Sequence, residues 1–217
     1  MLREKPDGFW KDGICMFLDG VSFVHKTNPF QTGRNHKSTG YRLKNEGLKV
    51  TSRGRKEGVN GKSVTYYVGI SYEKGVVMCS ELVDHCNGRN YAKFSEKELP
   101  PVFTKVGKGK CIVQDGCPVM NSGIVKSVYE RLGAEVFSIP ARSPDLNPVE
   151  NVFNNVRREL RQQAMEMQIR RETFDQFKIR VKNTLMLFCR QTIDRTIESM
   201  VKRLHQIIES GGYRTKY

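Results

Sequence analysis

The chain has 217 residues, enough for one sizeable domain with an appendage, and its 38% hydrophobic and 28% charged residues are the balance of a globular protein. Lys and Arg outnumber Asp and Glu by 37 to 23, and the formal net charge of +14 favours a polyanionic partner. No apolar run reaches the ~18 residues that a membrane span needs, and we find no signal segment, so nucleic acid is favoured over a membrane.

The N-terminal part of the sequence predicts strands interrupted by a long basic segment. Residues 13–24 contain two apolar runs around an Asp-Gly pair and predict a pair of strands. Residues 31–62 hold nine Lys or Arg and six glycines, which predicts a basic loop that leaves the sheet. Two further strands are predicted at 64–72 and 76–83, joined by a hairpin turn.

The rest of the sequence alternates strands with helices and then becomes helical. Short apolar runs predict strands at 111–115 and 135–139. Helical patterns cover 90–103, which we expect to end near its Pro-Pro pair, and then 122–132, 148–163, 172–188 and 191–209. This order predicts a mixed sheet covered by helices. The six cysteines include no CxxC pair, which indicates reduced thiols rather than a zinc site.

Three acidic residues lie at positions where a strand or a helix would leave the carboxylate accessible: Asp19, Asp115 and Glu150. Each has an ordinary structural explanation, because both aspartates precede a glycine as in turns, and Glu150 follows Asn147 at the spacing of a helix capping box. Together they form an oxygen-ligand set of the kind that Mg²⁺ prefers. Two such ions ~3.5–4 Å apart can hold both the attacking and the leaving oxygen of a phosphodiester displacement.

Two stretches, QDGCPVMNS at 114–122 and PARSPDLNPVENVFNNV at 140–156, resemble the catalytic domain of mariner-superfamily transposases. The 34 residues between the second and third acids (116–149) match the Tc1-like branch of that DDE group. The likeness extends to LDGVSF around Asp19 and to the C-terminal residues, so it covers nearly the whole chain.

The resemblance implies an α/β, ribonuclease-H-like fold, with a central mixed five-stranded sheet flanked by helices and a C-terminal helical extension. Residues 1–165 would form the catalytic domain, including the basic loop, and 166–217 the helices packed on it. By matching motifs, Asp19, Asp115 and Glu150 fall on the catalytic metal ligands of the family, for two Mg²⁺ ions that Mn²⁺ can replace.

The family chemistry implied is cleavage at transposon ends, followed by attack of the freed 3′ hydroxyl on target DNA at TA sites. Transposon-end and target DNA are then the expected partners, with a homodimer and a nuclear location as further expectations. Two alternatives remain open: an inactive DNA-binding remnant of a transposase, and a non-specific metal-dependent DNA nuclease.

Several features depart from the family pattern. Gly116, Cys117 and Met120 differ from the residues common beside the second acid. Paired helix-turn-helix modules open the related transposases, whereas Met1 lies close to the first predicted strand, so we expect a truncated copy that contacts mainly DNA phosphates. The expected DNA-contacting residues are Arg53, Arg55 and Lys56 in the basic loop, Arg142 before the SPDLNP motif, and Arg157 and Arg158 after Glu150.

Overall fold

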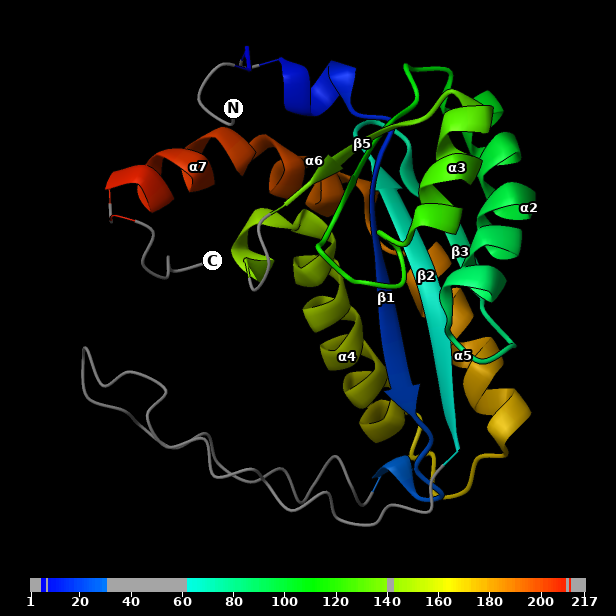
Figure 1. Cartoon of the computed structure of the whole chain (residues 1–217). Helices are drawn as coiled ribbons and strands as arrows, with labels where there is room; N and C mark the ends of the chain where they lie inside the picture. Colours follow the sequence, from blue (N-terminus) through cyan, green and yellow to red (C-terminus); the bar gives the residue numbers. More distant parts are fainter. Residues whose placement is uncertain (1–4, 7, 31–61, 140–142, 210, 212–217) are drawn as a thin grey trace.

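The computed structural model describes residues 5–6, 8–30, 62–139, 143–209 and 211. The centre of the fold is a mixed five-stranded sheet in the order β3-β2-β1-β4-β5 (Figure 1). β1 and β2 are antiparallel, as are β2 and β3, whereas β1, β4 and β5 run parallel. The strands are β1 (Met16–Val24), β2 (Ser63–Ser71), β3 (Gly75–Glu81), β4 (Cys111–Gln114) and β5 (Glu135–Ser138).

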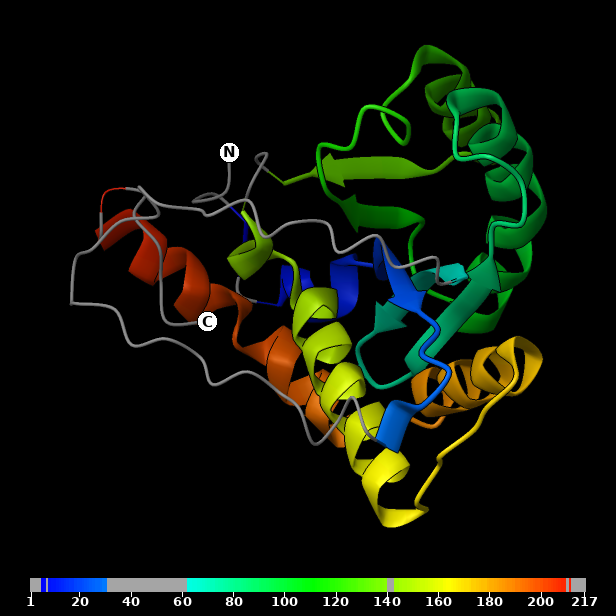
Figure 2. The same cartoon turned by 90° about the horizontal axis from the view of Figure 1, so that it is seen from below.

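Helices cover both faces of this sheet (Figures 1 and 2). α2 and α3 pack on one face, and α4, α5, α6 and α7 contribute to the hydrophobic cluster on the other. The helices are η1 (Phe9–Gly13), α2 (Gly88–Val106), α3 (Gly123–Leu132), η2 (Pro144–Leu146), α4 (Pro148–Glu166), α5 (Phe174–Met186), α6 (Arg190–Glu198) and α7 (Met200–Glu209). The predicted mixed sheet with flanking helices and a C-terminal helical extension is confirmed. In the described residues, no helix is both long enough and apolar enough to cross a membrane.

The predicted pair of strands within 13–24 is wrong, because β1 is one continuous strand. Its residues pair with β2 without a break from Phe17 opposite Ile70 to Val24 opposite Ser63. Gly20 serves packing instead of a turn, since a Cβ at this position would lie 3.0 Å from the ring of Tyr67. Long-range pairing with β2 therefore overrides the local Asp-Gly turn signal.

The predicted end of the second helix is also wrong, because α2 continues through Pro100 and Pro101 to Val106. Two prolines remove two N–H donors from the helix and disfavour it locally. Burial of Leu99 and Val102 on either side holds the helix against the core. The helix ends where Gly107 adopts the left-handed conformation, with φ of 67°.

The single helix predicted at 191–209 is two helices, α6 and α7, which meet at Ser199. The Ser199 hydroxyl donates to the carbonyl oxygen of Thr196 at 2.6 Å and accepts from Nε of Arg203 at 2.8 Å. Serine side chains that bond the backbone in this way compete with regular helix. The 3–4 spacing of apolar residues continues across the break and could not reveal it.

Both flanks of the basic segment are fixed by hydrogen bonds. The N–H of His25 donates to the carbonyl oxygen of Lys62 at 2.9 Å, one position beyond the β1–β2 ladder. The N–H of Phe30 donates to the carbonyl oxygen of Ile169, after α4, at 3.1 Å. Residues 31–61, with the predicted DNA contacts Arg53, Arg55 and Lys56, lie outside the described residues, as does Arg142. The predicted domain division at 165 falls at the C-terminal end of α4 and stays a prediction.

Candidate active site

The pairing of β1 with β4 brings the two predicted aspartates to one level. The strands run parallel with Met16 opposite Ile112 and Phe17 opposite Val113. Extending this register by two residues places Asp19 beside Asp115, which directly follows β4. Side chains two residues apart point to the same face of a strand, so both aspartates share the face of Phe17 and Val113. That is the face on which α4 packs.

The start of α4 supplies the third acid and a link to the first. Asn147 caps the helix, because its Oδ1 accepts from the N–H of Val149 at 3.3 Å. Its Nδ2 donates to Oδ2 of Asp19 at 3.1 Å. Asn147 is therefore the N-cap of α4, but it accepts from Val149, whereas the predicted capping box would use Glu150. Its side chain also reaches across to β1. Glu150, half-buried, lies in the first turn of the helix.

The loop after β4 holds the second acid by short-range hydrogen bonds. Oδ1 of Asp115 accepts from the N–H of Cys117 at 3.0 Å. Nδ2 of Asn121 donates to the carbonyl oxygens of Asp115 and Cys117, both at 3.0 Å. The family departures at 116 and 117 leave these bonds intact, since the loop uses main-chain groups there. Met120, the third departure, is buried at 2% exposure and packs away from solvent.

The pKa values of Asp19 and Glu150 are both raised, in part by the charges of neighbouring acids. Burial raises the pKa of Asp19 to about 7, and the charges of Asp115 and Glu150 add to this, while hydrogen bonds from Gly20 and Asn147 oppose it. Burial also raises the pKa of Glu150, as does Asp115, against the lowering effect of Arg157. The structure thus brings the three predicted acids into one electrostatic cluster.

We expect the metal-free protein to lose stability as the pH rises from about 4 to about 7. The carboxyl of Asp19 has an ordinary pKa of 3.8 and a folded-state pKa of about 7, so the folded state binds the proton more tightly in that range. At about 1.4 kcal/mol per unit, the loss is at most about 4 kcal/mol, and solvent screening of this half-buried group reduces it.

Urea unfolding in EDTA across this pH range measures the effect, and Asp19→Asn should remove most of the slope. Glu159→Gln on the opposite side of α4 is the control, with the slope retained. A slope that survives unchanged in Asp19→Asn would assign the pH dependence to a different group.

The cluster has the chemistry of a divalent-cation site. Its donors are carboxylate oxygens, the hard ligands that Mg²⁺ and Mn²⁺ prefer. Across the described ranges, no Lys or Arg nitrogen lies within 4.0 Å of a carboxylate oxygen of the three acids, so their charge lacks an ion-pair partner there. Within those ranges no three His, Cys, Asp or Glu side chains are close enough to coordinate one ion directly. Carboxylate donors of this kind suit an ion that keeps several of its waters, as Mg²⁺ does.

The sequence analysis missed one buried residue that supports the site. Arg203 of α7 is 2% exposed, and its Nη1 donates to the carbonyl oxygen of Asp145 and to Oδ1 of Asn151, both at 2.9 Å. These two acceptors flank the segment that contains Asn147 and Glu150. An arginine on the apolar face of a predicted helix, between Met200 and Leu204, was the available signal.

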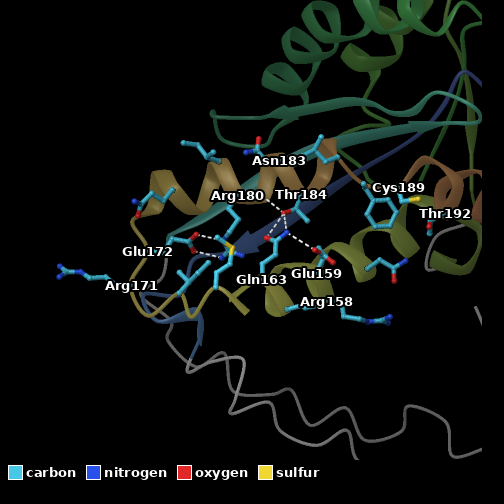
Figure 3. Close-up of a pocket in the computed structure, with 18 residues that line it drawn as sticks. Arg158, Glu159, Gln163, Arg171, Glu172, Arg180, Asn183, Thr184, Cys189 and Thr192 are labelled. Atoms are coloured by element: carbon cyan, nitrogen blue, oxygen red, sulfur yellow. Dashed lines mark hydrogen bonds and ion pairs between the residues drawn. The ribbon is translucent and has the colours of Figure 1, made fainter. Parts of the chain in front are cut away.

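The two arginines predicted to bind DNA from α4 lie in different surroundings. Arg157 stacks over the ring of Phe23 on β1, 5.9 Å from its centroid, and it lowers the pKa of Glu150. Arg158 lines a separate cavity of about 1030 Å³ between α4 and α5, the α4–α5 pocket, together with Glu159 (Figure 3). Of these two arginines, only Arg157 therefore lies on the side of α4 that carries Glu150.

Comparisons with known proteins find a matching family and several similar transposases. Residues 28–171 match the family model of the DDE superfamily endonucleases, a region that includes Asp115 and Glu150 and begins after Asp19. The chain is similar to the Tc1 transposase of Caenorhabditis elegans, at 30% identity over 57% of this chain and 43% of that protein. It is also similar to the Tcb2 transposase of Caenorhabditis briggsae, at 29% identity over 58% and 45%. The match thus spans less than half the length of these relatives.

Solved structures show the same fold. The catalytic domain of the Mos1 mariner transposase matches with a TM-score of 0.61 at 16% identity, covering 92% of this chain and 84% of that one. The Mos1 paired-end complex with Mg matches with a TM-score of 0.69 at 17% identity, covering 93% and 56%. The mixed sheet flanked by helices is thus the ribonuclease-H-like architecture of that catalytic domain.

Proposed function

The chain belongs to the DDE superfamily of endonucleases as a catalytic domain of Tc1/mariner type, and we propose that it cleaves DNA at transposon ends and joins the freed 3′ hydroxyl to target DNA at TA sites. One observation carries the proposal. The parallel register of β1 and β4 and the bond from Asn147 to Asp19 gather three acids from distant parts of the sequence at the start of α4. Transposon-end complexes of Mos1 with Mn and with Mg support DNA and a divalent ion as partners.

Each residue has a defined role in this proposal. Asp19, Asp115 and Glu150 would hold two divalent ions, which when bound polarise the phosphate and increase the acidity of the attacking water or hydroxyl. The N–H groups of Gly20 and Cys117 each fix one carboxylate oxygen, at 2.7 and 3.0 Å. Asn147 fixes the second oxygen of Asp19. These bonds orient the carboxylates before substrate binds, which reduces the reorganisation needed during the reaction.

The two proposed steps are displacements at phosphorus with no covalent enzyme intermediate. In cleavage, the water oxygen bonds to phosphorus and the bond to the 3′ oxygen breaks, leaving a 3′ hydroxyl and a 5′ phosphate after net transfer of one water proton. In joining, that 3′ hydroxyl oxygen attacks a target phosphorus, and the target 3′ oxygen leaves with the proton. A nuclear location and a homodimer follow from the family likeness and belong to the same proposal.

Two assays on the purified chain test the proposal. The first is nicking of supercoiled plasmid with Mn²⁺ or Mg²⁺, which EDTA should abolish. The second supplies a labelled DNA duplex with a free 3′ hydroxyl and should join it to plasmid at TA sites. Nicking without joining would support the non-specific nuclease instead. DNA binding with neither activity would support the inactive remnant.

A further inference from the structure

A second cavity, of about 440 Å³, lies between the end of β1 and α4, and we call it the α4 groove. Its floor is apolar and includes Phe23, Leu160 and Phe177, all less than 10% exposed. Its rim is cationic and includes Lys26, Arg157 and Arg161. An apolar floor with a charged rim suits a ligand that has both flat apolar surface and negative charge, as a DNA strand does.

The charges of the α4 groove have one sign. Four Lys or Arg line it, and no Asp or Glu does. The fourth cation, Arg180, is occupied, because it donates to both carboxylate oxygens of Glu172 at 2.7 and 2.8 Å. Lys26 and Arg161 form no ion pair in the part of the chain that the structure describes. Two cations are therefore available to a ligand.

The α4 groove lies on the same two elements as the acids, further along each of them. Arg157 and Arg161 are seven and eleven residues after Glu150, which is about 10 and 16 Å along the helix at a rise of 1.5 Å per residue. At 100° per residue, both point within about 20° of the direction of Glu150. That distance corresponds to roughly three to five nucleotides of one B-form strand, at about 3.4 Å each.

On this geometry we propose that the α4 groove binds the DNA strand next to the cleaved phosphate, with strand phosphates on Lys26 and Arg161 and the sugars and bases over the apolar floor. The proposal rests on the proposed function, because it fixes the path of the same DNA substrate away from the three acids. It differs from a general attraction of a basic surface for DNA, since it requires cations on one side of α4 only.

Arg158 is a matched control on the same helix. It is exposed, as is Arg161, and its loss changes the net charge by the same amount. However, it points about 80° from the direction of Glu150 and lines the α4–α5 pocket, which contains acidic as well as basic residues (Figure 3). A ligand bound in the α4 groove should therefore depend on Arg161 and not on Arg158, so this proposal replaces the expectation from the sequence that Arg158 contacts DNA.

Fluorescence anisotropy of a labelled DNA duplex, titrated with wild type, Arg161→Ala, Lys26→Ala or Arg158→Ala in EDTA, tests the proposal without any cleavage. We expect Arg161→Ala and Lys26→Ala each to weaken binding on the order of tenfold near 0.1 M salt and to reduce the salt slope by ~0.9, whereas Arg158→Ala leaves the slope unchanged. Equal losses in all three variants, or none in Arg161→Ala, would overturn the proposal. Because no metal is present, failure here is distinct from failure of the nicking assay.

Discussion

Asp115→Asn is expected to reduce metal-dependent nicking at least about 100-fold, because loss of a group that merely supports a metal ligand already costs 10–100-fold. The substitution keeps the shape of the side chain, and its Oδ1 can still accept from the N–H of Cys117. What is lost is one negative charge beside Asp19 and Glu150, whose pKa values Asp115 raises. The predicted effect is thus on cation binding and not on the fold.

A binding readout separates this effect from any loss of turnover. A ligand that binds only the folded state raises the melting temperature by mass action, so Mn²⁺ should stabilise the wild type and stabilise Asp115→Asn much less. Glu159→Gln removes the same charge from the far side of α4 and should behave as the wild type does in both measurements. Full nicking activity in Asp115→Asn would show that Asp115 is not a catalytic residue.

Arg203→Met is expected to impair nicking about 10–100-fold beyond what its loss of stability explains. Removing the guanidinium deprives the carbonyl oxygen of Asp145 and Oδ1 of Asn151 of a buried donor. Both bonds are part-buried, so leaving their acceptors unsatisfied should cost no more than about 1–3 kcal/mol. Both groups belong to the turn and first helical residues that place Asn147 and Glu150, so the acids should lose their mutual alignment.

Leu204→Ala supplies the comparison for stability alone. Leu204 is the next residue of α7, is 6% exposed, and its truncation should cost about 2–5 kcal/mol. Measured well below both melting temperatures, Leu204→Ala should retain nicking and stabilisation by Mn²⁺, while Arg203→Met should lose most of both. If the two variants lose activity in proportion to their stability, Arg203 is only a structural residue.

The sequence predicted most of the elements because their signals are local. The strands at 64–72 and 76–83 carry β-branched and aromatic residues around a short turn, and the structure places them within two residues of these bounds. Gly133 ends α3 in the left-handed conformation, as its position after Leu132 indicates. The helix predicted at 148–163 is α4, and its apolar residues, spaced three or four apart, form its buried face.

The errors at β1 and α2 occurred where packing against other parts of the chain decides the outcome. No local sequence pattern near Asp19 indicates that its strand pairs with residues more than forty positions later, so the Asp-Gly pair suggested a turn. The same holds for the site. The acids themselves were predicted from their motifs, but the bond from Asn147 to Asp19 spans 128 positions and that from Arg203 to Asn151 spans 52. Such contacts depend on the packed fold and leave only weak local traces in the sequence.

The hydrogen bond between His25 and Lys62 bears on how far the length of chain between these two residues can change. The β1–β2 ladder and this bond hold the two ends of the intervening segment together. Pairing within the sheet therefore offsets the conformational entropy that is lost when the two ends are brought together. Doubling the length of such a connection costs only ~0.6 kcal/mol. A change in the number of residues between these anchors is therefore expected to leave in place the register that aligns Asp19 with Asp115.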